Sequence, residues 1–74
     1  MARILIADEH PMTRLAVRLL LKEQLHSIVG EARDGLEALS LAASLTPDLL
    51  IIDLDLSRIT GLDVISHLRA RGVQ

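Results

Sequence analysis

Two short, uninterrupted apolar runs that each end in acidic residues constrain the fold of this chain more than any other feature. Residues 4–7 are followed by Asp8 and Glu9, and residues 49–52 are followed by Asp53. Continuous apolarity over four residues is typical of a strand that is covered on both faces, as in a parallel sheet. We therefore predict two buried strands whose carboxyl ends carry acids.

A third, weaker strand is predicted at residues 28–30, and helical patterns follow all three strands. Pro11 suits the first turn of a helix, where its missing N–H has no intrahelical partner. The apolar residues after it recur at helical spacing and form a predicted core-facing stripe: Met12, Leu15, Ala16, Leu19 and Leu20. Arg14, Arg18 and Lys22 lie four residues apart on another face and are predicted to be solvated.

The second helix is predicted to begin at Asp34, because Glu37 follows three residues later in a variant of the capping box. Its predicted apolar stripe is Ala38, Leu41, Ala42 and Leu45. The residue before a proline is driven out of the α region, so this helix is predicted to end near Thr46, before Pro47.

A third helix is predicted from about Leu62 to a stop at Gly72. The resulting order is β-α-β-α-β-α with short connections. That order predicts an α/β fold, with a parallel sheet, flanking helices and right-handed crossovers.

The composition excludes several classes of protein. A chain of 74 residues forms at most one small domain, and the absence of cysteine excludes disulfides and agrees with a cytoplasmic location. There is no aromatic residue for base stacking, no basic run, and a net charge of −2, so no direct nucleic-acid contact is predicted. The apolar runs are too short to span a membrane, and acids follow the first run too soon for a signal peptide.

The acids at the strand ends carry the predicted chemistry. If the first and third strands are neighbours, Asp8, Glu9 and Asp53 converge beyond one edge of the sheet, where open α/β sheets bind ligands. Two carboxylates about 4 Å apart repel by roughly 4 kcal/mol at an effective dielectric near 20. A Mg²⁺ ion would offset that repulsion, and a carboxylate can also attack phosphorus. The plainer alternative is that these acids are solvated loop residues.

Four stretches of the sequence resemble response regulator receiver domains. They are ILIADEHP at residues 4–11, EARDGLEAL at 31–39, PDLLIIDLDL at 47–56 and GLDVI at 61–65. The resemblance covers essentially the whole chain, and the acidic pair followed by His-Pro is most similar to the branch with a C-terminal helix-turn-helix output domain. It implies a flavodoxin-like sheet of which the first three βα units are present, in the strand order 2-1-3.

The resemblance also implies roles for individual residues. Asp53, with Gly61 eight residues later, matches the phosphoacceptor aspartate that a sensor histidine kinase modifies. Asp8 and Glu9 match the Mg²⁺ ligands, acting directly or through water, and Asp55 matches the position whose backbone carbonyl reaches the metal. The domain would be a substrate and partial catalyst of its own phosphorylation, not a turnover enzyme, and would control transcription in the full-length protein.

The sequence departs from the family pattern at several points. Glu9 stands where many relatives have Asp, and Leu56-Ser57 replaces the usual Met-Pro, so the loop after Asp53 loses a rigid residue. The fourth and fifth βα units, which carry a Ser or Thr and a Lys of the family site, have no counterpart. Residues 1–74 are therefore expected to be the N-terminal part of a receiver domain.

The missing units leave alternatives open. An uncovered third strand would be an apolar sheet edge, and such edges pair readily with another chain. A homodimer is therefore predicted, either through that strand or through exposed apolar helix faces. The second hypothesis is accordingly a truncated or engineered half-receiver that self-associates without phosphotransfer. The third hypothesis, which the sequence supports less, is a flavodoxin-like domain that binds a cofactor. His10 is predicted to be a loop residue, with contact to the site as the alternative, and Arg58 either meets a kinase or is solvated.

Overall fold

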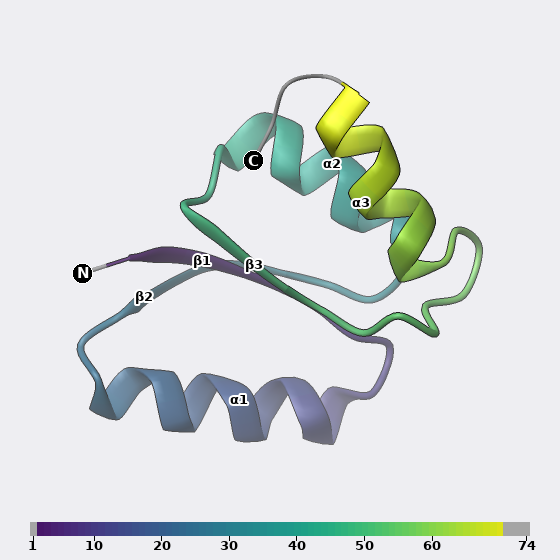
Figure 1. Cartoon of the computed structure of the whole chain (residues 1–74). Coiled ribbons are helices and arrows are strands. Elements are labelled where there is room, and N and C mark those ends of the chain that lie inside the picture. Colours follow the sequence, from purple (N-terminus) through teal and green to yellow (C-terminus); the bar gives the residue numbers. More distant parts are fainter. Residues whose placement is uncertain (1, 71–74) are drawn as a thin grey trace.

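The computed structural model describes residues 2–70, which form an α/β fold (Figure 1). In chain order the elements are β1 (Arg3–Ala7), α1 (Pro11–Glu23), β2 (Ser27–Ala32), α2 (Gly35–Leu45), β3 (Leu49–Ile52) and α3 (Gly61–Ala70). All strand pairs are parallel and the sheet order is β2-β1-β3, so the predicted fold class and strand order are confirmed. The predicted helix stop at Gly72 lies outside the described residues.

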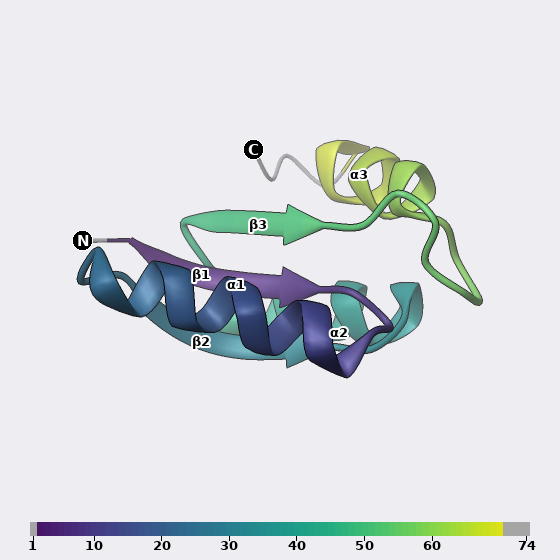
Figure 2. The same cartoon turned by 90° about the horizontal axis from the view of Figure 1, so that it is seen from below.

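The helices cover both faces of the sheet. Helix α1 lies on one face, and α2 and α3 lie on the other, with β1 in the centre (Figures 1 and 2). Ile4 and Ile6 alternate with Leu5 and Ala7 along β1, and all four are at most 1% exposed. Burial on both faces explains why the apolar run of this strand is uninterrupted.

The core between the sheet and the α2–α3 layer is built largely from small residues. Ala38 and Ala42 of α2 are buried against Leu5 and Ala7 of β1. Alanines at these positions let the helix backbone approach the sheet closely, while the leucines and isoleucines around them fill the remaining volume. The core thus needs none of the aromatic residues that the sequence lacks.

Strand boundaries agree with the sequence prediction to different degrees. Strand β3 is the predicted segment, and β1 begins one residue earlier, at Arg3. Strand β2 runs from Ser27 to Ala32 and is twice as long as the predicted 28–30 segment. It extends through Glu31, a polar residue that the apolar criterion rejected, because the carboxylate of Glu31 is paired with arginines of α1.

The predicted apolar stripe of α1 is wrong except at Leu15, which is half-buried. Met12, Leu19 and Leu20 are 74%, 55% and 64% exposed, so packing does not explain Met12. The half-buried positions of the helix include Val17 and Leu21. Apolar residues surround most of this helix, so their spacing alone could not select the face that meets the sheet.

The ends of α2 follow the predicted signals, with one difference in the capping box. The Asp34 carboxylate accepts a hydrogen bond from the Glu37 N–H (2.9 Å), but the Glu37 carboxylate accepts from Arg33 N–H rather than from Asp34. Thr46 ends the helix in a left-handed conformation (φ 43°), and the Arg3 guanidinium donates to the Thr46 and Leu45 carbonyls. These hydrogen bonds join β1 to the end of α2. The positive charge of Arg3 also interacts favourably with the negative end of the helix dipole.

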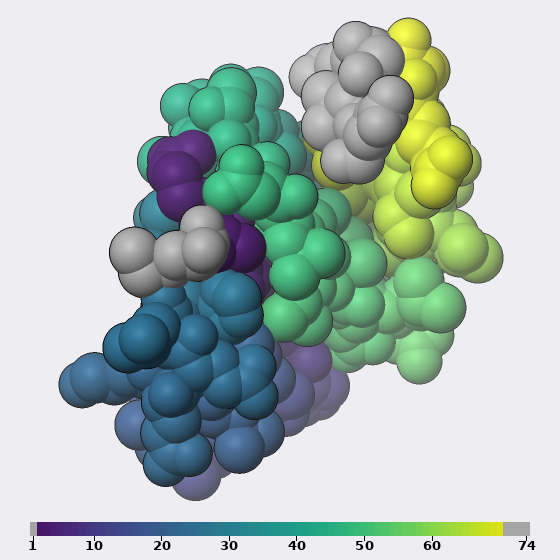
Figure 3. All heavy atoms as spheres, turned by 60° about the vertical axis from the view of Figure 1, so that its left-hand side comes forward, coloured from purple at the N-terminus to yellow at the C-terminus, as the bar shows by residue number. Residues whose placement is uncertain are grey.

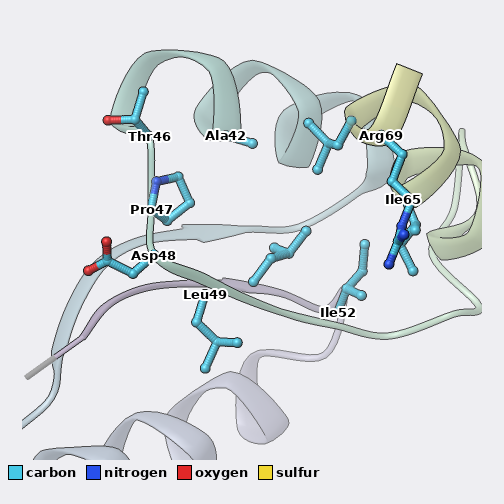
Figure 4. Close-up of a pocket in the computed structure, with 10 residues that line it drawn as sticks. Ala42, Thr46, Pro47, Asp48, Leu49, Ile52, Ile65 and Arg69 are labelled. Carbon is cyan, nitrogen blue, oxygen red and sulfur yellow. The ribbon is translucent and has the colours of Figure 1, made fainter. Parts of the chain in front are cut away.

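Strand β3 is an edge of the sheet formed by residues 2–70, and an apolar groove runs beside it. The groove has a volume of about 370 Å³ and lies between α2, β3 and α3 (Figure 4). Its lining includes Leu50, Ile65 and Leu68, and Leu49 at its end is 49% exposed. The green β3 segment reaches the surface between α1 and α3 in Figure 3. Within the described residues, none of the helices is long and apolar enough to cross a membrane.

Gly61, the first residue of α3, is predicted to tolerate no side chain. A Cβ there would lie 2.5 Å from the Asp53 carbonyl oxygen and 2.6 Å from the Leu54 Cα, both of which are backbone atoms. A Cβ on Gly30 would instead meet the flexible Leu45 side chain at 2.7 Å. We expect Gly61→Ala to lower the free energy of unfolding by about 2 kcal/mol or more, and Gly30→Ala by less than about 1 kcal/mol.

Urea denaturation followed by far-ultraviolet circular dichroism measures both variants. Equal losses of stability in the two variants would contradict the close backbone approach at Gly61.

Candidate functional site

The carboxyl ends of β1 and β3 place two aspartates side by side at one edge of the sheet. The N–H of Asp53 donates to the Ala7 carbonyl (2.9 Å), and the N–H of Asp8 donates to the Ala32 carbonyl (3.0 Å). Both aspartates therefore continue the ladders of the sheet by one residue. Their backbones are fixed by the pairing of the strands, whereas their side chains lie beyond the last paired residues.

Three side chains gather at this edge. One ligand atom each from Asp8, His10 and Asp53 lies within 4.8 Å of the other two. These residues line a hollow of about 380 Å³ together with Thr13 and Val17 of α1. The arrangement offers two carboxylates and one imidazole to a ligand at the strand ends.

His10 is a loop residue, as predicted, but its imidazole also contacts the site. The Asp8 Oδ1 accepts a hydrogen bond from the His10 backbone N–H (2.8 Å) and lies 2.8 Å from His10 Nδ1. The side-chain hydrogen bond between His10 Nδ1 and Asp8 raises the pKa of His10 above its ordinary value. The charges of Asp8, Glu9 and Asp53 raise that pKa further, and a partial loss of hydration lowers it. The preference for a histidine without contact to the site was wrong.

Glu9 and Asp55 lie at the margin of the site. The Glu9 Oε1 is 4.0 Å from His10 Nε2, and its side chain is 39% exposed. The Asp55 N–H donates to Asp53 Oδ1 (3.0 Å), while its own side chain is exposed. Their carboxylates are not part of the three-residue group, so of the four predicted metal ligands the structure gathers the side chains of Asp8 and Asp53.

The loop after Asp53 is anchored without a proline. Leu56 is 3% exposed and belongs to the hydrophobic core, and the Ser57 carbonyl accepts hydrogen bonds from the N–H groups of Gly35 and Ile59. A Cβ on Gly35 would collide with the Ile59 carbonyl, a constraint that sequence reasoning missed. Arg58 at the tip of the loop has a positive φ of 71°.

Arg14 was predicted to be solvated, and that prediction is wrong. Its side chain is 13% exposed, its Nε donates to Glu31 Oε1 (3.2 Å), and its Nη1 donates to the Asp8 carbonyl (2.7 Å). Arg18 Nη1 reaches the other Glu31 oxygen (2.7 Å) and is more exposed. The arginines of α1 thus bind β2, and one of them also binds the strand end that carries the site.

The fold and the site together define a class of protein. A three-stranded parallel sheet with strand order 2-1-3 and acids at the ends of its first and third strands is the architecture of a flavodoxin-like α/β domain with a ligand site at the strand ends. Comparison with known families specifies the class further. The family described as response regulator receiver domain matches residues 4–74, so the chain belongs to the receiver domains of response regulators in two-component systems.

Curated relatives include transcriptional regulators and response regulators. A putative transcriptional regulator of Pseudomonas aeruginosa is 49% identical over 70 residues, and NarL, the nitrate/nitrite response regulator protein of Escherichia coli, is 38% identical over 73 residues. The virulence regulator BvgA of Bordetella pertussis is 34% identical over 71 residues. These matches cover 95%, 97% and 96% of this chain but only 34% of the length of each relative.

Solved structures show the same fold. The signal receiver domain of the putative response regulator NarL from Mycobacterium tuberculosis superposes with a TM-score of 0.90 at 32% identity, over 97% of this chain and 59% of that one. A LuxR-family two-component response regulator from Aurantimonas also gives 0.90, at 35% identity, over 96% of this chain and 51% of that one. The resemblance found in the sequence is confirmed.

The raised pKa of His10 predicts a titration that depends on Asp8. The protonated imidazole paired with Asp8 persists below the raised pKa and is lost as the pH rises through it. We expect Asp8→Asn to lower the pKa of His10, because it removes the largest cause, and Glu9→Gln to lower it less. Titration of the His10 ring protons by NMR measures each value, and an unchanged pKa in Asp8→Asn would contradict the contact.

Proposed function

We propose that this receiver accepts a phosphoryl group on Asp53 from a phosphohistidine of a sensor kinase, in a reaction that requires Mg²⁺. The observation that carries the proposal is the gathering of Asp8 and Asp53 at one edge of the sheet, beside a hollow large enough for a phosphoryl group. Membership of the receiver family, whose response regulators pair with histidine kinases, supports the same conclusion.

The position of Asp53 suits a nucleophile. Its Oδ1 accepts the N–H of Asp55, which orients the carboxylate and leaves Oδ2 without a donor among the described residues. In the proposed step this oxygen attacks phosphorus, the P–N bond to the kinase histidine breaks, and the bonding electron pair returns to the imidazole nitrogen. The product is an aspartyl phosphate. The domain is consumed as a substrate and is not a turnover enzyme.

The donor set fits Mg²⁺. Two carboxylate charges within 4.8 Å of each other repel by about 3 kcal/mol or more at an effective dielectric near 20, and a hard dication would offset that repulsion. We assign the carboxylates of Asp8, Glu9 and Asp53 and the backbone carbonyl of Asp55 to the ion, directly or through water. The ion supplies positive charge that stabilises the transferring phosphoryl group. The position of Glu9 on an exposed loop beside His10 lets its side chain turn towards the ion.

Phosphorylation of the intact chain tests the proposal directly. After incubation with a small-molecule phosphodonor and Mg²⁺, we expect the mass to rise by one phosphoryl group. Asp53→Asn should abolish the addition because the nucleophile is gone, whereas Asp55→Asn, which keeps the backbone carbonyl, should retain it. Intact-mass spectrometry distinguishes these outcomes.

A folded parent chain that gains no mass, or an Asp53→Asn variant that still gains it, would overturn the assignment of the phosphoacceptor.

The relatives support a proposal about the wider setting of the domain. We propose that residues 1–74 are the N-terminal part of a receiver domain in a cytoplasmic regulator whose phosphorylation controls transcription. One support is the matched share of the relatives, 34% of the length of two regulators and 59% of a solved receiver domain. The other is the description of those two regulators as transcriptional regulators.

A second candidate function, self-association, is favoured by the edge of β3. Strand β3 pairs with β1 alone within the described residues, and the apolar groove beside it is open (Figure 4). We propose that two copies of the 74-residue chain pair along this edge, as exposed apolar edge strands do. This homodimer would not require phosphorylation. It corresponds to the second hypothesis, a half-receiver that self-associates without phosphotransfer.

Charge at the strand edge is expected to prevent the pairing. Leu49→Lys puts an ammonium group at the edge, whereas Leu36→Lys places the same change at a comparably exposed leucine of α2. We expect a dimer mass for the parent and for Leu36→Lys, and a monomer mass for Leu49→Lys, by analytical ultracentrifugation. A monomeric parent at micromolar concentration would exclude the edge as a dimer interface.

A further inference from the structure

The loop that carries the candidate cation site is held at both of its ends by hydrogen bonds from Arg14, and the one at its start comes from the side chain. The Arg14 guanidinium donates to the Asp8 carbonyl (2.7 Å), at the start of the turn of residues 8–10. The backbone N–H of Arg14 donates to the His10 carbonyl (3.1 Å), at the end of the same turn. Within the turn, the Asp8 side chain accepts the His10 N–H (2.8 Å). The three hydrogen bonds close the turn into a compact unit.

The guanidinium that makes these contacts is itself fixed. The side chain of Arg14 is 13% exposed, and its Nε donates a hydrogen bond to Glu31 of β2. The residue after Glu31, Ala32, pairs with Ala7 of β1. An arginine with two separate acceptors loses the freedom that a surface side chain would keep. The strand end, the turn and α1 are therefore tied together through one side chain that lies outside the group formed by Asp8, His10 and Asp53.

We propose that Arg14 is a positioning residue: by holding the Asp8 carbonyl it fixes the 8–10 turn, and so the carboxylates of Asp8 and Glu9, in the orientation that binds the divalent cation. The inference rests on the proposed function for the identity of that cation. Groups that orient metal ligands without touching the metal typically change its affinity by about 10- to 100-fold when they are removed.

Electrostatics alone predicts the opposite sign. Removing a positive charge beside Asp8 would strengthen cation binding if Arg14 acted only through its charge. Glu31 lies against the guanidinium and offsets that charge, so an effect of position is separated from an effect of charge by removing both members of the ion pair at once. The double variant Arg14→Gln/Glu31→Gln keeps the net charge of the chain unchanged.

Arg18 supplies a matched control. It bonds the same Glu31 carboxylate from the same helix but makes no contact with the 8–10 turn. The double variant Arg18→Gln/Glu31→Gln therefore loses the same two residue types and also leaves the net charge unchanged. It keeps the hydrogen bond from Arg14 to the Asp8 carbonyl. The two double variants differ in whether that carbonyl is held and in which arginine is left without Glu31. In the control the unpaired charge of Arg14 acts against cation binding, so a larger Kd in Arg14→Gln/Glu31→Gln is not an effect of charge.

Two NMR measurements on the full chain test the proposal. In a Mg²⁺ titration followed through the amide signals of Asp8 and Asp53, we expect the Kd to rise about tenfold in Arg14→Gln/Glu31→Gln and less than twofold in Arg18→Gln/Glu31→Gln. In the metal-free protein, we expect the heteronuclear NOE of the Glu9 and His10 amides to fall in the first double variant only.

The outcomes are distinguishable. Equal Kd values and equal NOE values in the two double variants would overturn the positioning role, as would tighter Mg²⁺ binding in Arg14→Gln/Glu31→Gln. A parent chain that binds no Mg²⁺ would overturn the proposed function instead, and the NOE comparison would then decide by itself whether Arg14 orders the turn.

Discussion

The parallel pairing of β1 with β3 is the constraint on which the rest of the structure depends. Its register, Ile4 with Leu49 through Ala7 with Ile52, brings both carboxyl ends to the same edge, and the hydrogen bond from the Asp53 N–H to the Ala7 carbonyl carries it one residue further. A slip of one residue would turn every side chain of β3 to the opposite face. Burial of the strands therefore determines where the candidate phosphoacceptor lies.

Much of this fold could be predicted from the sequence, because burial on both faces leaves a continuous apolar run in β1. Strand β3 has the same kind of run, but it is only partly buried among the described residues, so the prediction that it is a buried strand is wrong. The start of α2 at Asp34 was equally predictable, since the cap is a local interaction. The orientation of α1 was not, because apolar residues surround the helix and the arginine predicted to be solvated lies against the sheet. Its partner Glu31 is 17 residues away in the sequence, beyond the reach of any local pattern.

The candidate site, like the fold, could be predicted from the sequence only in part. The convergence of Asp8 and Asp53 follows from strand order alone, whereas the contact between His10 and Asp8 depends on how tightly the turn after β1 closes. An aspartate two residues before a histidine was the available signal, since an aspartate side chain often accepts a nearby backbone N–H. Gly35 gave no such signal, because its constraint comes from the loop near Ile59, and sequence spacing does not reveal which backbone segments approach each other.

The central claim is that the acids of two neighbouring strands form one divalent-cation site around the phosphoacceptor. The most direct measurement is an anomalous difference map from crystals of the protein in which Mn²⁺ replaces Mg²⁺. The account predicts one peak at the edge of the sheet, coordinated by the Asp53 carboxylate and by at least one carboxylate of the Asp8–Glu9 pair. A peak elsewhere, or no peak at that edge in a crystal soaked to saturation, would contradict the account.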